Sequence, residues 1–120
     1  MEEKHILGKK GEKIAESYLL KNSYNIYEKN WWYLKGEIDI IAQKGDFIVF
    51  VEVKTRSTSD YGSPESFVSS KQQKMIINAA QEYIVRNNHD YEARFDIISI
   101  ILIGNNYEID HIEDAFYPTL

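Results

Sequence analysis

The stretch that decides the fold is FIVFVEVK, residues 47–54. Its first five residues are all β-branched or aromatic, which predicts a strand that is buried on both faces. Glu52 and Lys54 end this strand, and they point to the same side of it because side chains alternate along a strand. An acid and a base at the end of a buried strand indicate a functional site that uses charged side chains.

A second apolar strand is predicted over Gly36–Gln43, with Asp39 in its middle. The turn at residues 43–46 is short, so pairing of the two strands as neighbours would place Asp39 beside Glu52. Two carboxylates about 4 Å apart repel each other by roughly 4 kcal/mol at an effective dielectric constant near 20. A divalent cation between them removes this repulsion. The two strands therefore predict a metal site with Lys54 close by.

The alternative is that Glu52 and Lys54 form an exposed ion pair, which contributes little to stability in most proteins. Asp39 favours the metal site, because a carboxylate inside an apolar strand is rare unless it is paired or bound to a metal. Glu37 lies on the same strand face as Asp39. Its role is left open between a metal ligand, an outer hydrogen-bond acceptor and an ordinary edge residue.

A series of short motifs runs in order along about ninety residues of the chain. The motifs are Gly8-x-x-Gly11-Glu12-x-x-Ala15-x-x-Tyr18-Leu19, Asn30-Trp31, Gly36-Glu37-Ile38-Asp39, Phe50-Val51-Glu52-Val53-Lys54-Thr55-Arg56, Gly62-x-Pro64-Glu65, Lys71-Gln72, Ala79-Ala80-x-x-Tyr83-Ile84 and Arg94-Phe95-Asp96. Through them the chain resembles the YraN family of small bacterial proteins. Asp39 with Glu52-x-Lys54 also resembles the signature of the restriction-endonuclease-like nucleases, and the family is similar in turn to the archaeal-type Holliday junction resolvases.

The resemblance implies a restriction-endonuclease-like α/β fold, in which a central mixed five-stranded sheet is flanked by helices in the order αβββαββ. It also implies a metal-dependent endonuclease acting on nucleic acid, with DNA favoured and branched repair or recombination intermediates among the candidate substrates. Asp39, Glu52 and Glu12 would bind Mg²⁺ or Mn²⁺. Lys54 would complete the catalytic set by acting on the attacking water and the phosphate. Without the resemblance, Glu12 is an ordinary solvated acid on a helix.

Hydrophobic periodicity predicts the order of the elements. Helices are expected over His5–Asn22 and from Ser69 or Ser70 to Arg86; strands over Tyr24–Lys29, Gly36–Gln43, Phe47–Lys54, Ala93–Leu102 and Tyr107–Ile112; and a polar loop over Thr55–Pro64. The chain has 120 residues and no linker, repeat or low-complexity tract. One domain over residues 1–120 is therefore predicted.

The net charge of −5 is unusual for a protein that binds nucleic acid, because phosphate binding is driven largely by cations. Bound Mg²⁺ would offset the predicted acids locally. Lys71 and Lys74 begin the second helix, where the helix dipole disfavours a cation and a phosphate would explain one. These two lysines and Arg56 are predicted to contact nucleic acid, with solubilising surface charge as the alternative.

Three consecutive aromatic residues, Trp31, Trp32 and Tyr33, are candidates either for stacking on unpaired bases or for packing in the core or an interface. Two functions other than catalysis stay open: a non-catalytic nucleic-acid-binding accessory of repair, recombination or DNA uptake, and a protein-interaction module. The complete set of Glu12 and the three strand residues favours the enzyme. The three histidines show no ligand spacing and are assigned no role.

The chain has no cysteine, which predicts neither a disulfide framework nor a thiolate metal site. No apolar signal segment is visible near its start, and the longest apolar run, residues 97–103, is too short to cross a membrane. A cytoplasmic protein with no membrane contact is expected. The sequence leaves open whether the protein forms a homodimer and whether its nucleic acid is DNA or RNA.

Overall fold

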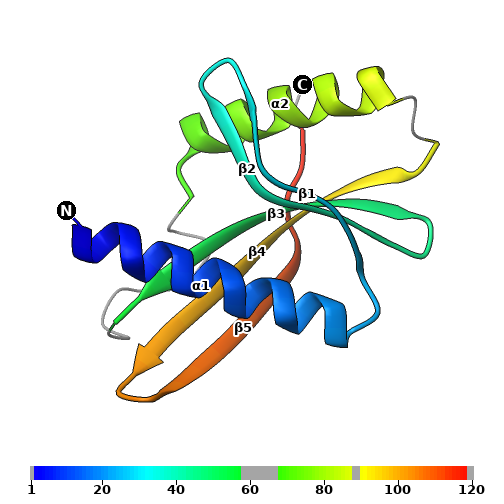
Figure 1. Ribbon diagram of the computed structural model, residues 1–120. Helices are drawn as coiled ribbons and strands as arrows, with labels where there is room; N and C mark the ends of the chain where they lie inside the picture. The colour runs from blue at the N-terminus through cyan, green and yellow to red at the C-terminus, as the bar shows by residue number, and fades with distance from the viewer. Residues whose placement is uncertain (1, 58–67, 88–89, 119–120) are drawn as a thin grey trace.

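The computed structural model describes residues 2–57, 68–87 and 90–118, which form a five-stranded sheet with a helix packed on each face (Figure 1). The elements in chain order are α1 (Glu2–Lys21), β1 (Asn25–Tyr33), β2 (Gly36–Lys44), β3 (Phe47–Arg56), α2 (Ser70–Asn87), β4 (Glu92–Ile103) and β5 (Asn106–Phe116). This order and the mixed sheet confirm the predicted αβββαββ arrangement.

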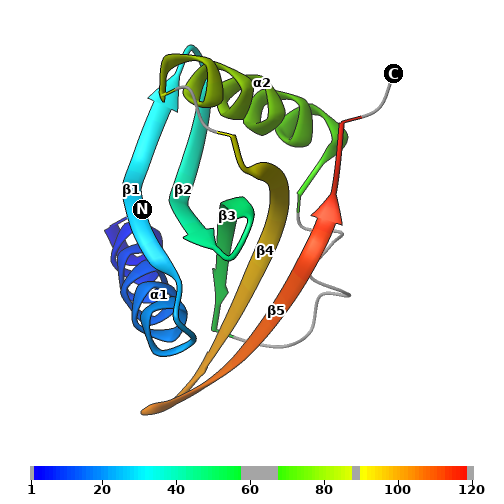
Figure 2. The same cartoon turned by 90° about the vertical axis from the view of Figure 1, so that its right-hand side faces the viewer.

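The strands follow one another across the sheet in sequence order, β1-β2-β3-β4-β5. Strands β3 and β4 are parallel over ten residue pairs, and the other neighbours are antiparallel. A parallel pair needs a long crossover connection, and α2 lies within the segment that joins β3 to β4. Figure 2 shows the two helices on opposite sides of the sheet. This topology places β3 at the centre of the sheet.

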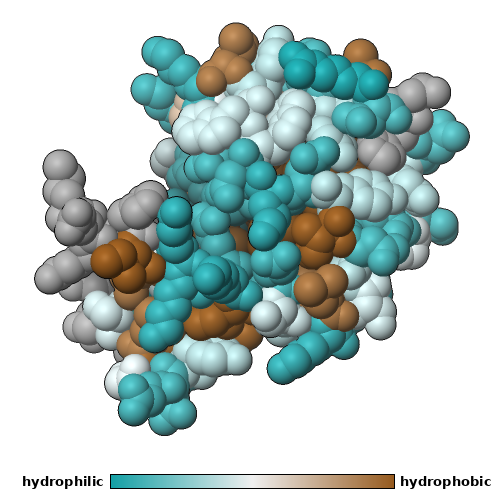
Figure 3. All heavy atoms as spheres, in the orientation of Figure 1, coloured by the Kyte–Doolittle hydropathy of each residue, from teal (hydrophilic) through white to brown (hydrophobic). Residues whose placement is uncertain are grey.

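Alternate residues of β3 face two different cores, which explains why residues 47–51 are all apolar. Ile48 and Phe50 pack in the core under α2, whereas Val49 and Val51 pack in the core under α1. The prediction of a strand buried on both faces is confirmed. On the face drawn in Figure 3, hydrophilic side chains dominate and hydrophobic residues appear only as separate patches.

Several predicted boundaries were wrong, and the largest errors lie at the ends of strands. Strand β1 continues past Lys29 to Tyr33, because an edge strand with alternating exposure needs no apolar run. Strand β5 continues past Ile112 to Phe116, whose ring is buried under α2. Thr55 and Arg56, predicted to open a loop, extend β3, and residues 58–64 of that loop lie outside the described residues.

The start of α2 is set by Ser69. Its Oγ accepts a hydrogen bond from the backbone N–H of Gln72 at 3.1 Å, the usual contact of a helix N-cap. Of the two predicted caps, Ser69 is therefore the one that the structure uses. In the part of the chain that the structure describes, neither helix is long and apolar enough to cross a membrane.

Candidate active site

The candidate site forms where β2 and β3 separate. Their pairing runs from Lys44↔Phe47 to Ile40↔Val51 and stops there, although both strands continue. The first residues beyond the last pair are Asp39 on β2 and Glu52 on β3. The two predicted acids therefore stand at the fork between the strands.

At this fork the carboxylate of Asp39, and not a backbone carbonyl of β2, accepts a hydrogen bond from a backbone N–H of β3. Its Oδ2 accepts a hydrogen bond from the backbone N–H of Val53 at 2.8 Å. A buried N–H group needs an acceptor, and the strand pairing no longer supplies one here. Asp39 and Glu52 are only 7% and 6% exposed. This contact explains how an aspartate is held inside an apolar strand.

Glu52 raises the energetic cost of a negative charge on Asp39. Burial raises the pKa of Asp39 well above its usual value, and the hydrogen bond and negative charge of Glu52 raise it further. The Val53 N–H lowers this pKa, and Glu12 adds a smaller upward contribution. Asp39 is thus a buried acid whose surroundings oppose its negative charge.

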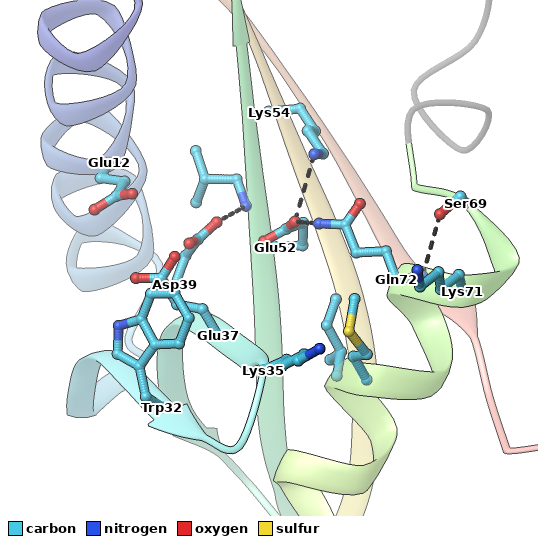
Figure 4. Close-up of a pocket in the computed structure, with 14 residues that line it drawn as sticks. Glu12, Trp32, Lys35, Glu37, Asp39, Glu52, Lys54, Ser69, Lys71 and Gln72 are labelled. Carbon is cyan, nitrogen blue, oxygen red and sulfur yellow. Dashed lines mark hydrogen bonds and ion pairs between the residues drawn. The ribbon is translucent and has the colours of Figure 1, made fainter.

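Glu52 has two further neighbours that converge on its side chain (Figure 4). Gln72 on α2 donates a hydrogen bond from Nε2 to Glu52 Oε2. Lys54 Nζ lies 3.5 Å from the same oxygen, and the Lys54 side chain is 27% exposed. Strand alternation brings Lys54 to the side of Glu52, and the partial exposure lets its ammonium group reach the solvent in front of the acids.

Helix α1 brings Glu12 to the same place because Gly11 has no side chain. A Cβ atom on Gly11 would lie 1.7 Å from Thr55 Oγ1 and 2.8 Å from Thr55 Cβ. Such distances are impossible, so only glycine allows the helix to press on β3 at this point. A Cβ atom on Gly8, in contrast, would meet nothing within 4 Å.

Asn30 connects the acids of α1 and β2. Its Nδ2 donates to Glu12 Oε1 at 3.0 Å and to Glu37 Oε2 at 3.3 Å. The residue lies in β1 between the pairs Lys29↔Ile40 and Trp31↔Ile38, and it has a φ of 51°. Asparagine tolerates this left-handed conformation better than most residues, and strained backbone of this kind is frequent at functional sites.

Glu37 joins the site through this contact. Burial raises its pKa, the hydrogen bond from Asn30 lowers it, and the charges of Glu12 and Glu52 raise it again. The Glu37 side chain lines the same cavity as Asp39 and Glu52. Of the three roles left open for Glu37, this position and the contact with Asn30 favour the outer hydrogen-bond acceptor.

These side chains line a cavity of about 540 Å³ between α1, the β1–β2 hairpin and the start of α2. The lining residues are Glu12, Trp32, Lys35, Gly36, Glu37, Asp39, Glu52, Val53, Lys54, Ser69, Lys71, Gln72, Met75 and Ile76. A smaller cavity of about 230 Å³ adjoins it, lined by Lys9, Glu12, Lys13, Glu16, Lys29, Asn30, Asp39 and Ile40. Glu12 and Asp39 line both cavities.

The structure brings only some of the predicted cationic and aromatic residues to the cavity. Lys71 lines the larger cavity, whereas Arg56 and Lys74 are not among its lining residues. Trp31 packs edge-on against Tyr83 with ring centroids 5.1 Å apart. Trp32 lines the cavity and is 59% exposed. Trp31 therefore packs in the core, as one alternative predicted. The other alternative, stacking on bases, stays a prediction for Trp32.

Sequence reasoning did not assign Gln72 and Asn30 to the site. Both belong to motifs that carried the family resemblance, and this membership was the signal that could have assigned them to the site. Their contacts, however, join residues that are 20 and 18 positions apart in the chain. No local spacing predicts such contacts, because they depend on how α1, β1 and α2 are placed around the sheet.

A second group of buried charged residues lies under α1, away from the cavity. Asp96 is fully buried and accepts hydrogen bonds from Arg94 at 3.0 and 2.8 Å, from His111 Nε2 at 2.7 Å and from the backbone N–H of Asp114 at 3.0 Å. Burial alone would raise the pKa of Asp96, but the hydrogen bonds from His111 and Arg94 hold it below its usual value. His111, to which no role was assigned, is thus part of a structural network.

Comparison with known proteins identifies relatives along nearly the whole chain. A family model described as "Uncharacterised protein family UPF0102" matches residues 11–100, which include every predicted catalytic residue. A UPF0102 protein of Flavobacterium psychrophilum is 47% identical, with 98% of both chains covered. A UPF0102 protein of Geobacter metallireducens is 46% identical over 92% of this chain and 91% of its own. These matches confirm the identification made from the motifs, and the names of these relatives state no activity.

Proposed function

The chain belongs to the uncharacterised protein family UPF0102, and we propose that it is a metal-dependent endonuclease that hydrolyses phosphodiester bonds in nucleic acid. The observation that carries this proposal is the pair of buried carboxylates at the β2–β3 fork, Asp39 and Glu52, with Lys54 beside them. Two acids held together inside a protein, without a cation in direct contact with both, indicate a site that is completed by a ligand.

The donor atoms of the cavity are suited to Mg²⁺ or Mn²⁺. Among the described residues, no group of three or more histidine, cysteine, aspartate or glutamate side chains is arranged to hold a metal ion. The cavity offers carboxylate oxygens from Asp39 and Glu52, while Glu12 is engaged by Asn30. Mg²⁺ accepts such sparse oxygen ligation because it retains several waters. Asp39 and Glu52 would therefore hold the cation directly and Glu12 through water.

When bound, the cation supplies Lewis-acid chemistry, by making water more acidic and offsetting charge on the phosphate. The protein's own groups provide orientation. The Val53 N–H holds Asp39, and Gln72 holds Glu52. The Lys54 ammonium would orient the attacking water and stabilise the negative charge that develops on the phosphate in the transition state.

Local cations around the acids give an acidic protein a means of binding nucleic acid. Lys35, Lys54 and Lys71 line the larger cavity, and the smaller cavity is lined by three further lysines. Phosphate binding depends on such local contacts more than on net charge. Of the predicted contacts, Lys71 lines the cavity and would meet a phosphate there, whereas Arg56 and Lys74 would act only outside it. DNA remains the favoured substrate.

Lys54→Ala separates catalysis from binding. The variant should keep metal-dependent binding and lose cleavage by about 10²-fold or more, because its ammonium acts mainly in the transition state. The measurement is single-turnover cleavage of labelled duplex, single-stranded, flap and four-way-junction substrates with Mg²⁺ and Mn²⁺. Asp39→Asn, purified in parallel, controls for contaminating nuclease.

Lys71→Ala is the matched comparison, and it should weaken binding and reduce its salt dependence, as expected for one lost phosphate contact. Equal cleavage rates for the parent and Lys54→Ala would contradict the nuclease assignment. Binding without cleavage of any substrate would replace it with the non-catalytic nucleic-acid-binding accessory.

A further inference from the structure

The β1–β2 hairpin places an aromatic side chain on the rim of the acidic cavity. Strand alternation turns Trp31 and Tyr33 toward the core under α2 and leaves Trp32 on the other side of β1. Trp32 lines the cavity together with the acids. Figure 4 shows Trp32 and Glu37 on the hairpin side of the cavity, across from Gln72 and Lys71 on α2.

A single exposed aromatic residue needs no explanation by itself, because every protein surface contains some. The position of Trp32 is what matters. A phosphate that reaches Asp39 and Glu52 brings its own nucleoside to the rim of the same cavity, since only one sugar separates base from phosphate. The indole of Trp32, 59% exposed, provides a flat apolar surface at that rim.

The face of a base is available for stacking only when the base is unpaired. In a duplex, neighbouring base pairs cover both faces, whereas a single strand can lay successive bases on aromatic side chains. The carboxylates are also recessed, at 7% and 6% exposure, so the phosphate must enter the cavity to reach them. A flexible single strand can enter in this way more easily than a stiff duplex.

The two cavities lie on either side of a shared pair of acids, so one strand could occupy both. Glu12 and Asp39 line both, and lysines lie on either side of these acids: Lys35 and Lys71 in the larger cavity, Lys9 and Lys13 in the smaller. A strand whose scissile phosphate lies at the acids would therefore meet cations on both sides. This arrangement combines a cationic path for the backbone with an aromatic surface for a base, the two elements of single-strand binding.

We propose that Trp32 stacks on an unpaired nucleobase next to the scissile phosphate, so that the substrate is single-stranded or carries an unpaired segment. This assignment of substrate class rests on the proposed nuclease function. The indole acts by binding the base, and the chemistry remains with Asp39, Glu52 and Lys54.

The test is binding of a labelled oligothymidylate, measured by fluorescence anisotropy with Ca²⁺ in place of Mg²⁺, so that a divalent cation is present to support binding while cleavage is suppressed. Trp32→Ala should weaken binding about 5- to 150-fold, the range for loss of one base–aromatic stack, while Trp32→Phe retains most of the affinity. Tyr107→Ala is the matched control, because Tyr107 is also exposed, at 50%, but does not line the cavity. Its affinity should equal that of the parent, and melting curves verify that each variant is folded.

An oligomer of the same length with abasic sugars isolates the base contact. The parent and Trp32→Ala should bind it equally, because no base is present to stack. A duplex should likewise bind both proteins with similar affinity. If Trp32→Ala weakens binding of the abasic oligomer or the duplex as much as that of oligothymidylate, or leaves oligothymidylate binding unchanged, the stacking proposal is overturned.

Cleavage assays distinguish failure of this proposal from failure of the nuclease assignment. In the parent, unpaired substrates should be cut faster than duplex, and Trp32→Ala should reduce this preference. Unchanged preference in a protein that cuts would overturn stacking and leave the nuclease intact. Base-dependent binding through Trp32 in a protein that cuts nothing would retain stacking and overturn the nuclease. A Trp32→Ala change in oligomeric state, without any change in oligonucleotide binding, would assign the residue to a protein interface instead.

Discussion

Two aspartates are buried in the same sheet, and their surroundings are opposite. Asp96 on β4 accepts hydrogen bonds from a guanidinium, an imidazole and a backbone N–H, and its pKa lies below the usual value. Asp39 on β2 has one backbone N–H and a neighbouring carboxylate, and its pKa lies well above the usual value. Their exposed fractions, 0% and 7%, are nearly the same.

The extent of burial therefore does not distinguish a structural acid from a candidate functional one. The hydrogen-bonding and charged partners of the carboxylate make the distinction. A carboxylate whose negative charge is balanced within the protein stabilises the fold. A carboxylate held against another acid costs stability until a ligand supplies positive charge. Asp39 has the second arrangement and lines a cavity, whereas Asp96 has the first and lies beneath α1.

The largest expected effect is on stability, from Asp96→Asn. It should lower the free energy of unfolding by about 3–5 kcal/mol, because the mostly buried Arg94 would lose its buried counter-ion and keep only the exposed Glu113, at 3.6 Å. Asp39→Asn is the matched substitution, and in EDTA it should leave stability unchanged or raise it, because the repulsion from Glu52 disappears. Urea unfolding at pH 7 measures both. Equal destabilisation by the two substitutions would contradict the comparison.

The pH dependence checks the origin of the Asp96 contribution. Its pKa in the folded protein is below the unfolded value of about 4, so the stabilisation is present above that pH and is lost as the pH falls through the folded-state pKa. The stability difference between the parent and Asp96→Asn should therefore shrink below about pH 4. A difference that is the same at acidic and neutral pH would show that the carboxylate charge is not responsible.

A smaller effect is expected from metal binding at the other aspartate. Millimolar Mg²⁺ or Mn²⁺ should raise the melting temperature of the parent, because a ligand that binds only the folded state stabilises it, by about 2.7 kcal/mol at one hundred times its Kd. Asp39→Asn should remove this response. Glu108→Gln, which changes an exposed acid on β5, is the control and should retain it. Calorimetry that finds equal metal-induced stabilisation in the parent and Asp39→Asn would rule out the site.

The smallest effect should come from Tyr18→Phe. The Tyr18 hydroxyl lies 2.9 Å from His111 Nδ1, and removing this hydrogen bond should cost about 1 kcal/mol. Tyr117→Phe, on an exposed tyrosine, should cost almost nothing. Because the Asp96 network and the cavity are separate, the metal response should be unchanged in Tyr18→Phe. Loss of that response would show that the two regions are coupled through α1.

The sequence by itself determined the order of the elements and the two acids on neighbouring strands. Helical and strand periodicities are local signals, and the apolar run 47–51 requires a central strand whatever surrounds it. Strand ends at Tyr33 and Phe116 could not be predicted in this way, because edge strands alternate or depend on distant packing. The resemblance to a family added Glu12, which no local pattern distinguishes from a solvated helix acid.

Only the tertiary structure decided what surrounds each charge. The end of the β2–β3 pairing at Ile40↔Val51 gives Asp39 its contact with Val53, and the crossover through α2 brings Gln72 to Glu52. The hydrogen bond from Tyr18 to His111 joins residues 93 positions apart. Whether a buried acid is neutralised or opposed depends on such long-range contacts, because electrostatic energy follows distance in space and not position in the chain. For this reason the sequence predicted two acids close together, while their electrostatic state appeared only in the folded protein.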